Sequence, residues 1–246
     1  MVASLELDPE IERLRSIIPN FDTMTEEQLR EAFFFLDFLN TLIVIEAKKG
    51  QGKTLLAIAL ATKFKELFNK KVLLDFQPFE AFGEFMYLDE KKFMSELNKV
   101  TDIVRDTSEN EVEIGVKWSL KKMGLDIEGS VMVLDEAYRY FDCRTPADKL
   151  VRVFGYFVAQ MRHYHITLIL LCPSKRYLDR RVRDQIDYLG KVAFNKRTLN
   201  AHARFLSYLT GDIKPLKVHG PNYFHMYDSW SPVAIRKKVL DLKGQL

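Results

Sequence analysis

Cysteine, glycine and proline are all scarce in this chain of 246 residues. Its two cysteines, eleven glycines and eight prolines exclude a disulfide-stapled scaffold, a collagen-like fibre and a low-complexity linker protein. The hydrophobic share is 47% and the charged share 29%, which is the composition of an ordinary folded domain. The length fits one large domain or two small ones.

Long apolar runs are also missing. The most apolar stretch, residues 33–47, is interrupted by Asp37, Asn40 and Glu46, whereas a membrane-spanning helix needs about 20 apolar residues. The first eleven residues are acidic and lack the basic-then-apolar pattern of an export signal. These absences predict a soluble, cytoplasmic protein without a membrane span.

A large charge excess is missing as well. The chain has 37 Lys and Arg against 34 Asp and Glu, a formal net charge of +3, which is too small to indicate a nucleic-acid-binding protein by itself. The distribution of charge is therefore more informative than the sum.

Hydrophobic patterning predicts one α/β domain over residues 41–246 and a helical extension over residues 1–40. A buried strand at 41–47, a helix at 55–68 and a strand at 71–75 form a βαβ unit, which requires parallel strands. Further strands are predicted at 130–135, 166–172, 191–195 and 223–227, and further helices at 90–104, 110–123, 149–163, 178–189 and 200–209. We therefore expect a central, mostly parallel sheet flanked by helices.

Two of the rare glycines stand together between the first predicted strand and its helix. The segment Ala47-Lys-Lys-Gly-Gln-Gly-Lys-Thr54 matches the end of the P-loop pattern G-x-x-x-x-G-K-[ST], with Ala47 in place of the first glycine. Backbone N–H groups of such a loop cradle phosphates, while Lys53 would reach the β and γ phosphates of ATP and Thr54 would bind Mg²⁺. The predicted nucleotide-binding residues are Lys49, Gly50, Gln51, Gly52, Lys53, Thr54 and Leu55. The alternative is a chance Gly-Lys-Thr turn.

Two adjacent acids follow the predicted strand at 130–135. Carboxylates at the carboxyl end of a parallel strand lie at the ligand-binding edge of the sheet. Asp135 would hold Mg²⁺ and Glu136 would orient and activate the attacking water. The pair follows the phosphate loop at the spacing of a Walker B motif, and a second acid is typical of ATPases rather than of kinases or small GTPases.

Several segments resemble the HerA–FtsK superfamily and the related Zot-like proteins. Asp135-Glu-Ala-Tyr-Arg-Tyr-Phe141 resembles the extended Walker B motif of these ATPases. Residues 160–171 resemble their arginine-bearing segment, and residues 173–188 resemble the stretch after the next strand. The resemblance runs from about residue 41 to residue 197, with an extension to Trp230 left open, and is greatest to compact ATPases of archaeal viruses and plasmids, including genome-packaging ATPases.

This resemblance implies a RecA-like core that hydrolyses ATP, assembles as a ring of identical subunits (commonly a hexamer) and translocates double-stranded DNA. For a viral protein it also implies a location in the host cytoplasm and a capsid component as a partner. Arg162 matches the position of an arginine finger that would act in the neighbouring subunit's site. Its alternative is a surface arginine at a helix end, and Arg152 and Arg144 are weaker candidates for the finger.

The segment after the predicted strand at 166–172 departs from the family pattern. Where the family has a polar sensor such as Thr-Gln, this chain has Cys172-Pro-Ser174. Since proline has no amide side chain, Ser174 is the remaining sensor candidate. Cys172 is expected to be a buried structural thiol.

A basic cluster follows within nine residues and comprises Lys175, Arg176, Arg180, Arg181 and Arg183. In a ring, these side chains could contact DNA phosphates without reading sequence. They could instead be solvated and paired with Asp179, Asp184 and Asp187, or line a subunit interface.

Three functions therefore remain open: a DNA-translocating motor, an ATPase that extrudes virions or protein as Zot-like proteins are thought to do, and a nucleotide-switched binding module of the partition or loader type. Lys48 stands where partition-type ATPases carry a loop lysine, unless it is simply solvated. Glu136 and Arg162 favour a motor.

Overall fold

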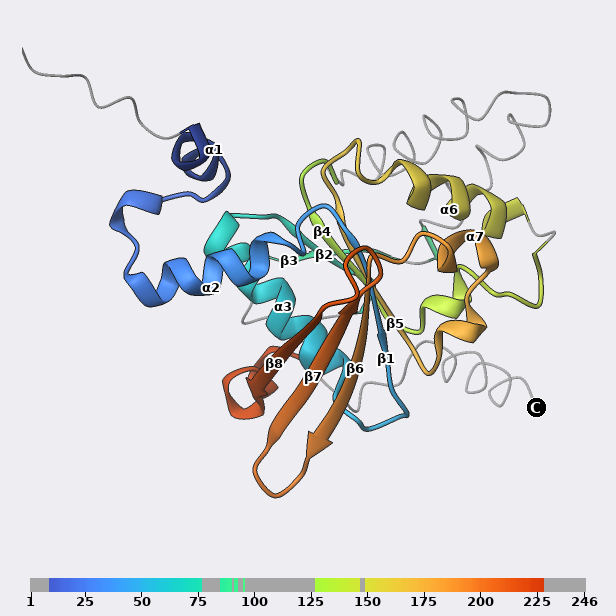
Figure 1. Ribbon diagram of the computed structural model, residues 1–246. Coiled ribbons are helices and arrows are strands. Elements are labelled where there is room, and N and C mark those ends of the chain that lie inside the picture. Colours follow the sequence, from blue (N-terminus) through green and yellow to red (C-terminus); the bar gives the residue numbers. More distant parts are fainter. Residues whose placement is uncertain are drawn as a thin grey trace, which may run out of the picture.

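The computed structural model describes residues 9–76, 85–89, 91, 92, 95, 127–146 and 149–227. At its centre lies an eight-stranded sheet with the strand order β3-β2-β4-β5-β1-β6-β7-β8 (Figure 1). The strands are β1 (Leu42–Glu46), β2 (Val72–Leu74), β3 (Phe85–Tyr87), β4 (Val131–Leu134), β5 (Thr167–Cys172), β6 (Tyr188–Asn195), β7 (Asn200–Ser207) and β8 (Ile213–His219).

The sheet has a parallel part and an antiparallel part. All neighbouring strands from β3 to β6 run parallel, whereas β7 runs antiparallel to both β6 and β8. The predicted mostly parallel sheet is confirmed. The central strands β1, β4 and β5 are apolar runs that are buried on both faces, as parallel strands between two helical layers must be.

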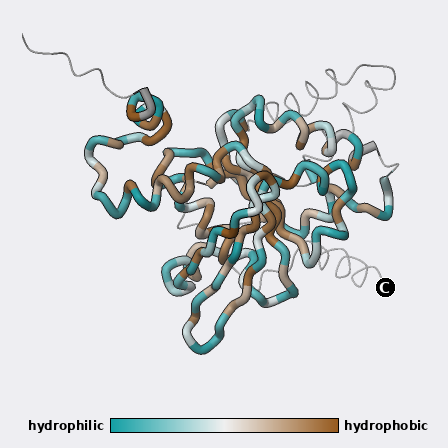
Figure 2. Tube along the Cα trace, viewed as in Figure 1, coloured by the Kyte–Doolittle hydropathy of each residue, from teal (hydrophilic) through white to brown (hydrophobic). Residues whose placement is uncertain are grey.

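Helices cover both faces of the parallel part. The helices are α1 (Pro9–Ile17), α2 (Glu26–Leu36), α3 (Lys53–Phe68), α6 (Lys149–Gln160) and α7 (Arg180–Arg183), and the 3-10 turns are η1 (Phe21–Thr23), η4 (Ala137–Arg139), η5 (Lys175–Tyr177), η6 (Gly220–Asn222) and η7 (Phe224–Met226). Side chains of α2 and α3 form one hydrophobic core with one face of the sheet, and α6 and α7 form a second core with the other face. In Figure 2 the most hydrophobic trace runs through the central strands between these layers.

The N-terminal helices form where the sequence predicts them. Helix α2 begins with a capping box, in which the Gln28 N–H donates to the Thr25 hydroxyl at 3.2 Å and the Thr25 N–H donates to the Gln28 side chain at 2.8 Å. Ala32 and Phe35 of α2 belong to the same core as α3. The extension is therefore packed against the sheet domain.

Three predictions in the last third of the chain are wrong. The predicted helix at 178–189 contains only one helical turn, α7, which begins after its N-cap Asp179. The turn cannot continue as a helix because the chain pairs with β1 as β6 from Tyr188 onward. The predicted helix at 200–209 is strand β7, in which buried and exposed side chains alternate. The predicted strand at 223–227 contains a 3-10 turn, and the real third antiparallel strand is β8. The predicted helices at 90–104 and 110–123 lie outside the described residues, apart from positions 91, 92 and 95, which are helical.

Among helices in the described part of the chain, none combines the length and the apolarity needed to cross a bilayer.

Candidate nucleotide site at the carboxyl edge of the sheet

The glycine-containing loop joins β1 to α3 at the carboxyl edge of the parallel strands. Gly50 and Gly52 have φ values of +75° and +85°, in the left-handed region that glycine adopts without strain. A methyl group placed on Gly52 would also lie 3.3 Å from the Cβ of Phe194. Both the backbone and the packing therefore call for glycine at position 52, and α3 begins directly after it at Lys53.

The side chain of Lys53 is buried, which is unusual for a lysine. Its Nζ donates hydrogen bonds to the carbonyl oxygens of Ala47 at 2.8 Å and Lys48 at 3.3 Å. The ammonium group is thus held inside the loop, where a phosphate cradle requires positive charge. Ala47, which replaces the usual first glycine, contributes through its backbone carbonyl, for which no glycine is needed.

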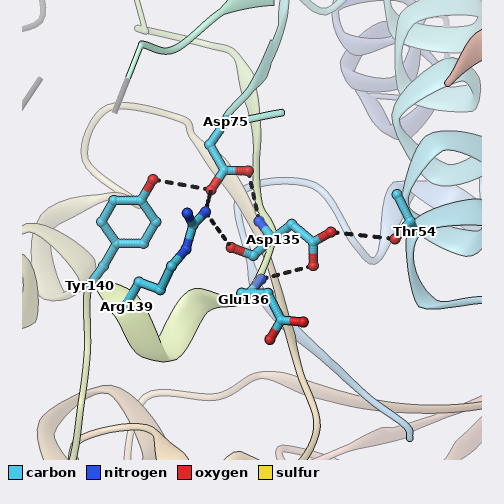
Figure 3. A network of polar contacts seen from close by, with 6 residues as sticks. All are labelled: Thr54, Asp75, Asp135, Glu136, Arg139 and Tyr140. Carbon is cyan, nitrogen blue, oxygen red and sulfur yellow. Dashed lines mark hydrogen bonds and ion pairs between the residues drawn. The ribbon is translucent and has the colours of Figure 1, made fainter. Parts of the chain in front are cut away.

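The Walker B acids meet this loop across the sheet edge. The Thr54 hydroxyl donates to Asp135 Oδ2 at 3.4 Å, and the Glu136 N–H donates to Asp135 Oδ1 at 2.8 Å (Figure 3). Hydroxyl and carboxylate oxygens are the ligand types that Mg²⁺ prefers. Thr54 and Asp135 therefore offer the donor types that a magnesium site requires, and their role as its ligands stays a prediction.

Glu136 occupies an unusual backbone position. Its φ is +49°, in the left-handed region that non-glycine residues rarely adopt and that is found at functional sites. One carboxylate oxygen, Oε2, is buried and accepts no hydrogen bond from the residues that the structure describes. An acid held in this way is suited to accept a proton or a hydrogen bond from a water molecule.

The sequence prediction missed a polar network behind these acids (Figure 3). Asp75, just after β2, has a side chain with no exposed surface. It accepts hydrogen bonds from the Asp135 N–H at 2.8 Å, from Arg139 at 3.1 Å and from the Tyr140 hydroxyl at 3.1 Å. Arg139 also donates to the carbonyl of Asp135 at 3.1 Å. A strand of apolar residues ending in an acid, Lys71-Val-Leu-Leu-Asp75, was the available signal.

Burial dominates the electrostatics of the two central acids. It raises the pKa of Asp75 to about 7, against the effect of the Asp135 N–H and the Arg139 guanidinium, which lower it. Burial also raises the pKa of Asp135, and the nearby Glu136 carboxylate adds to this rise, whereas the Glu136 N–H and Lys53 oppose it. A cation bound beside Asp135 would compensate the negative charges of the neighbouring Asp135 and Glu136 carboxylates.

Arg162 lies at the opposite edge of the sheet from the phosphate loop. It follows α6, just before β5 begins, and pairs with Asp187. Asp187 in turn accepts from the N–H of Leu42, the first residue of β1, at 2.7 Å, whereas the phosphate loop follows the last residue of β1. The Arg162 side chain is 62% exposed. Within its own subunit it is therefore not part of the nucleotide site.

Ser174 and the basic cluster follow β5 at the nucleotide edge. The Ser174 hydroxyl accepts from the Arg176 N–H at 3.4 Å and caps η5, so one acceptor position of the sensor candidate is used locally. The Lys175 N–H donates to the Glu46 carboxylate at 3.1 Å. Glu46, which the sequence prediction did not select, thus ties the end of β1 to the start of the basic cluster.

The five side chains of the basic cluster do not lie together. Lys175, Arg180 and Arg183 line a common pocket with Asp184 and Tyr208. Arg181 instead packs against Gly155 of α6. A methyl group placed on Gly155 would lie 3.3 Å from the Arg181 side chain. Arg176 is exposed. Cys172 is buried, and burial raises its pKa to about 12, which agrees with a structural thiol.

Comparisons with known proteins agree with this geometry. A model of the family described as Zonular occludens toxin (Zot) matches residues 41–232. The N-terminal domain of zonular occludens toxin from Neisseria meningitidis is similar in structure, with a TM-score of 0.52 and 17% identity over 77% of this chain and 100% of that chain. A search of curated proteins gives no match.

The genome packaging NTPase B204 from Sulfolobus turreted icosahedral virus 2 also matches. Its complex with AMPPCP has a TM-score of 0.46 and 15% identity over 72% of this chain and 96% of that chain. Its complex with ATP-gammaS has a TM-score of 0.47 and 17% identity over 73% and 98%. The family match includes both the phosphate loop and the acids after β4. The chain therefore belongs to the zonular occludens toxin (Zot) family, and its fold is that of a RecA-like P-loop ATPase.

Proposed function

We propose that this P-loop ATPase hydrolyses ATP to translocate double-stranded DNA through a ring of identical subunits, as a genome-packaging motor does. The observation that carries the proposal is the meeting of Thr54, Asp135 and Glu136 at one sheet edge, with the Thr54 hydroxyl 3.4 Å from Asp135. These groups come from α3 and from the end of β4, about eighty residues apart in sequence.

Each residue has a chemical role in this proposal. The loop N–H groups of residues 49–55 and the Lys53 ammonium bind the phosphates. Thr54 and Asp135 hold Mg²⁺, which would neutralise charge on the phosphates. Glu136 orients the attacking water and takes up its proton. Ser174 is the remaining candidate for a residue that senses the γ-phosphate.

The position of Arg162 supports assembly into a ring. A guanidinium at the far edge of the sheet cannot reach the phosphates of its own subunit, but it is exposed and available to a neighbour's site. Such a finger stabilises the charge that develops during phosphoryl transfer. A hexamer is the assembly that the motif resemblance implies, and a capsid component would be its partner in a virus.

Two observations support DNA as the cargo. Residues 135–141 and 160–188 resemble the motifs of ring-shaped DNA motors, and basic side chains gather after β5. A sequence-independent motor needs phosphate contacts of this kind rather than contacts to base edges.

The test is the rate of phosphate release with and without double-stranded DNA, on protein sized with bound nucleotide. We expect a ring and a DNA-stimulated rate, and we expect Lys53→Ala to abolish hydrolysis while the matched surface variant Lys92→Ala does not. Full activity in Lys53→Ala would overturn the assignment of the site. Slow turnover with ATP-dependent dimerisation would indicate a loader-type module, and a rate unaffected by DNA would indicate an extrusion ATPase.

A further inference from the structure

The antiparallel strands β6, β7 and β8 have two unlike faces. On one face Ala201, Ala203 and Phe205 are buried in the core that α2 and α3 complete. On the other face the alternate residues of β7, His202 and Arg204, are exposed. Figure 1 shows these strands extending beyond the layer formed by α6 and α7. Within the described residues, this second face is open to solvent.

The open face is basic. Lys191, His202, Arg204, Lys217 and His219 are exposed on it, and none of the three strands, all fully described, contains an Asp or a Glu. Between residues 188 and 227 the sequence has a single acid, Asp212, against the cations Lys191, Lys196, Arg197, Arg204, Lys214 and Lys217. We call Lys191, His202, Arg204, Lys217 and His219 the basic face.

The arrangement of these cations does not serve folding. Lys191 is directly opposite Arg204 in the β6–β7 pair, and His202 is directly opposite Lys217 in the β7–β8 pair. Like charges in opposite positions, as Lys191 and Arg204 are, destabilise a sheet. Lys191 is 72% exposed and has a long contact of 3.8 Å to the Glu46 carboxylate, which is 18% exposed. A ligand that carries negative charge would compensate this repulsion.

A basic pocket adjoins the same side of the sheet. Leu189 belongs to the core under α6 and α7, so Lys191, two residues further along β6, points to the α7 side. There Lys175, Arg180, Arg183, Asp184 and Tyr208 line a pocket of about 540 Å³. Tyr208 directly follows β7, which connects the pocket to the basic face.

The cations of the pocket are poorly neutralised. Arg180 pairs with Asp184 at 3.2 Å, but both side chains are strongly exposed, at 83% and 63%. The Nε of Arg183 is buried and has no hydrogen-bond partner among the described residues. Lys175 contacts the Tyr208 hydroxyl, a neutral partner. The strongly exposed guanidinium of Arg180 is therefore accessible to an anionic oxygen, with which it can form a charge-assisted hydrogen bond.

We propose that the basic face and the adjoining pocket form the surface that binds the phosphate backbone of double-stranded DNA. This inference rests on the proposed function and extends it, because it moves most phosphate contacts from residues 175–183 to strands β6–β8. A two-fold contact between copies of the chain through this face would bring equal charges together. A polyanion is therefore the complementary occupant, and contacts to phosphates alone make binding independent of sequence.

The test compares two pairs of substitutions in the full chain. The double variant Arg204→Gln/Lys217→Gln neutralises the basic face, and Lys91→Gln/Lys92→Gln removes two exposed lysines elsewhere. Binding of a mixed-sequence DNA duplex is measured by fluorescence anisotropy across a salt series. We expect the first variant to bind DNA at least about tenfold more weakly than wild type at 0.1 M salt. The slope of log affinity against log salt should be shallower by about 2. The control pair should bind as wild type does.

Two further measurements keep the outcome decisive. The melting temperature shows whether the double variant is folded, and Arg180→Gln, at an 83% exposed side chain, tests the pocket independently with an expected slope change of about 1. Equal DNA affinity in wild type and all variants would overturn the inference and leave the proposed function intact. Absence of DNA binding by the wild type would instead overturn the proposed function. Loss of ring assembly with retained DNA affinity would make the face a subunit interface and overturn the inference.

Discussion

Asp75 accepts a hydrogen bond from the backbone N–H of Asp135 at 2.8 Å. This contact joins the end of β2 to the end of β4, and the same carboxylate binds Arg139 of the turn that follows Glu136. The buried acid therefore fixes the backbone from which both Walker B side chains project. Asp75 is a positioning residue, because it reaches the reacting groups only through Asp135 and Arg139.

Replacing Asp75 by Asn should slow turnover without weakening nucleotide binding. The amide keeps an acceptor for the Asp135 N–H, but its NH₂ group would face the donors Arg139 and Tyr140. We expect kcat to fall about 10- to 100-fold, as for other residues that orient metal ligands. Steady-state kinetics together with a fluorescent nucleotide titration separates kcat from affinity. The control is Asp22→Asn, whose carboxylate forms an exposed pair with Arg15. A loss of affinity equal to the loss of kcat would contradict a positioning role.

The raised pKa of Asp75 predicts how stability changes with pH. Since its pKa in the folded protein is about 7, above the ordinary value of 3.8, the folded chain binds this proton more tightly than the unfolded chain. Its contribution is favourable at low pH and is lost as the pH rises through about 7. We expect the wild type to lose about 1–3 kcal/mol more than Asp75→Asn between pH 5 and pH 8. Urea unfolding at both pH values measures this, and parallel pH dependences would refute it.

Substitution of Glu136 by Gln should stop the chemical step and spare ATP binding. The amide has the same size but cannot take a proton from water, and such a loss costs about 100-fold or more. Single-turnover hydrolysis and nucleotide binding, measured on the same protein, test this. Glu66→Gln, on the exposed side of α3, is the matched control. Hydrolysis at the wild-type rate would remove Glu136 from the mechanism.

Arg162→Ala should bind ATP but hydrolyse it poorly, and mixing should restore activity. If Arg162 acts in the neighbour's site, a mixed ring of Arg162→Ala and Glu136→Gln subunits contains sites with an intact Glu136 and an intact Arg162. We expect turnover in the mixture and almost none in either variant alone. Arg30→Ala, an exposed arginine on α2, should behave as wild type. Failure of the mixture to recover, with rings still formed, would contradict a finger that acts between subunits.

The sequence predicts the parts of this protein in which one local pattern is dominant. The strand at 41–47 and the helix after it appear as β1 and α3, because an uninterrupted apolar run can only be buried. Residues 200–209 misled the prediction, since Ala201 and Ala203 have high helix propensity, whereas pairing with β6 and β8 decides their conformation. The helix or strand propensity of a short segment carries no information about the neighbouring strands with which that segment pairs.

The candidate site likewise contains residues that a local sequence pattern predicts and residues that only the fold brings into place. Lys53, Thr54, Asp135 and Glu136 were found because they belong to contiguous motifs, and the structure brings them together. Their catalytic and binding roles stay predictions, as does the division of the chain at residue 40. Asp75 belongs to no motif, and its importance comes from a contact across 60 residues of sequence. Contacts of that kind are defined by the strand order rather than by any local pattern.

The overhang of β6 gives the phosphate loop a mechanical connection to the outer strands. Pairing between β1 and β6 ends at Lys191, and the last part of β6 continues with β7 alone. Phe194, on this overhang, packs directly against Gly52 of the loop. Closely packed groups transmit displacement, so this contact couples the position of the loop to that of the β6–β7 hairpin. Lys196 and Arg197 lie in the turn between β6 and β7, so the phosphate loop is connected through Phe194 to a basic turn at the end of the sheet.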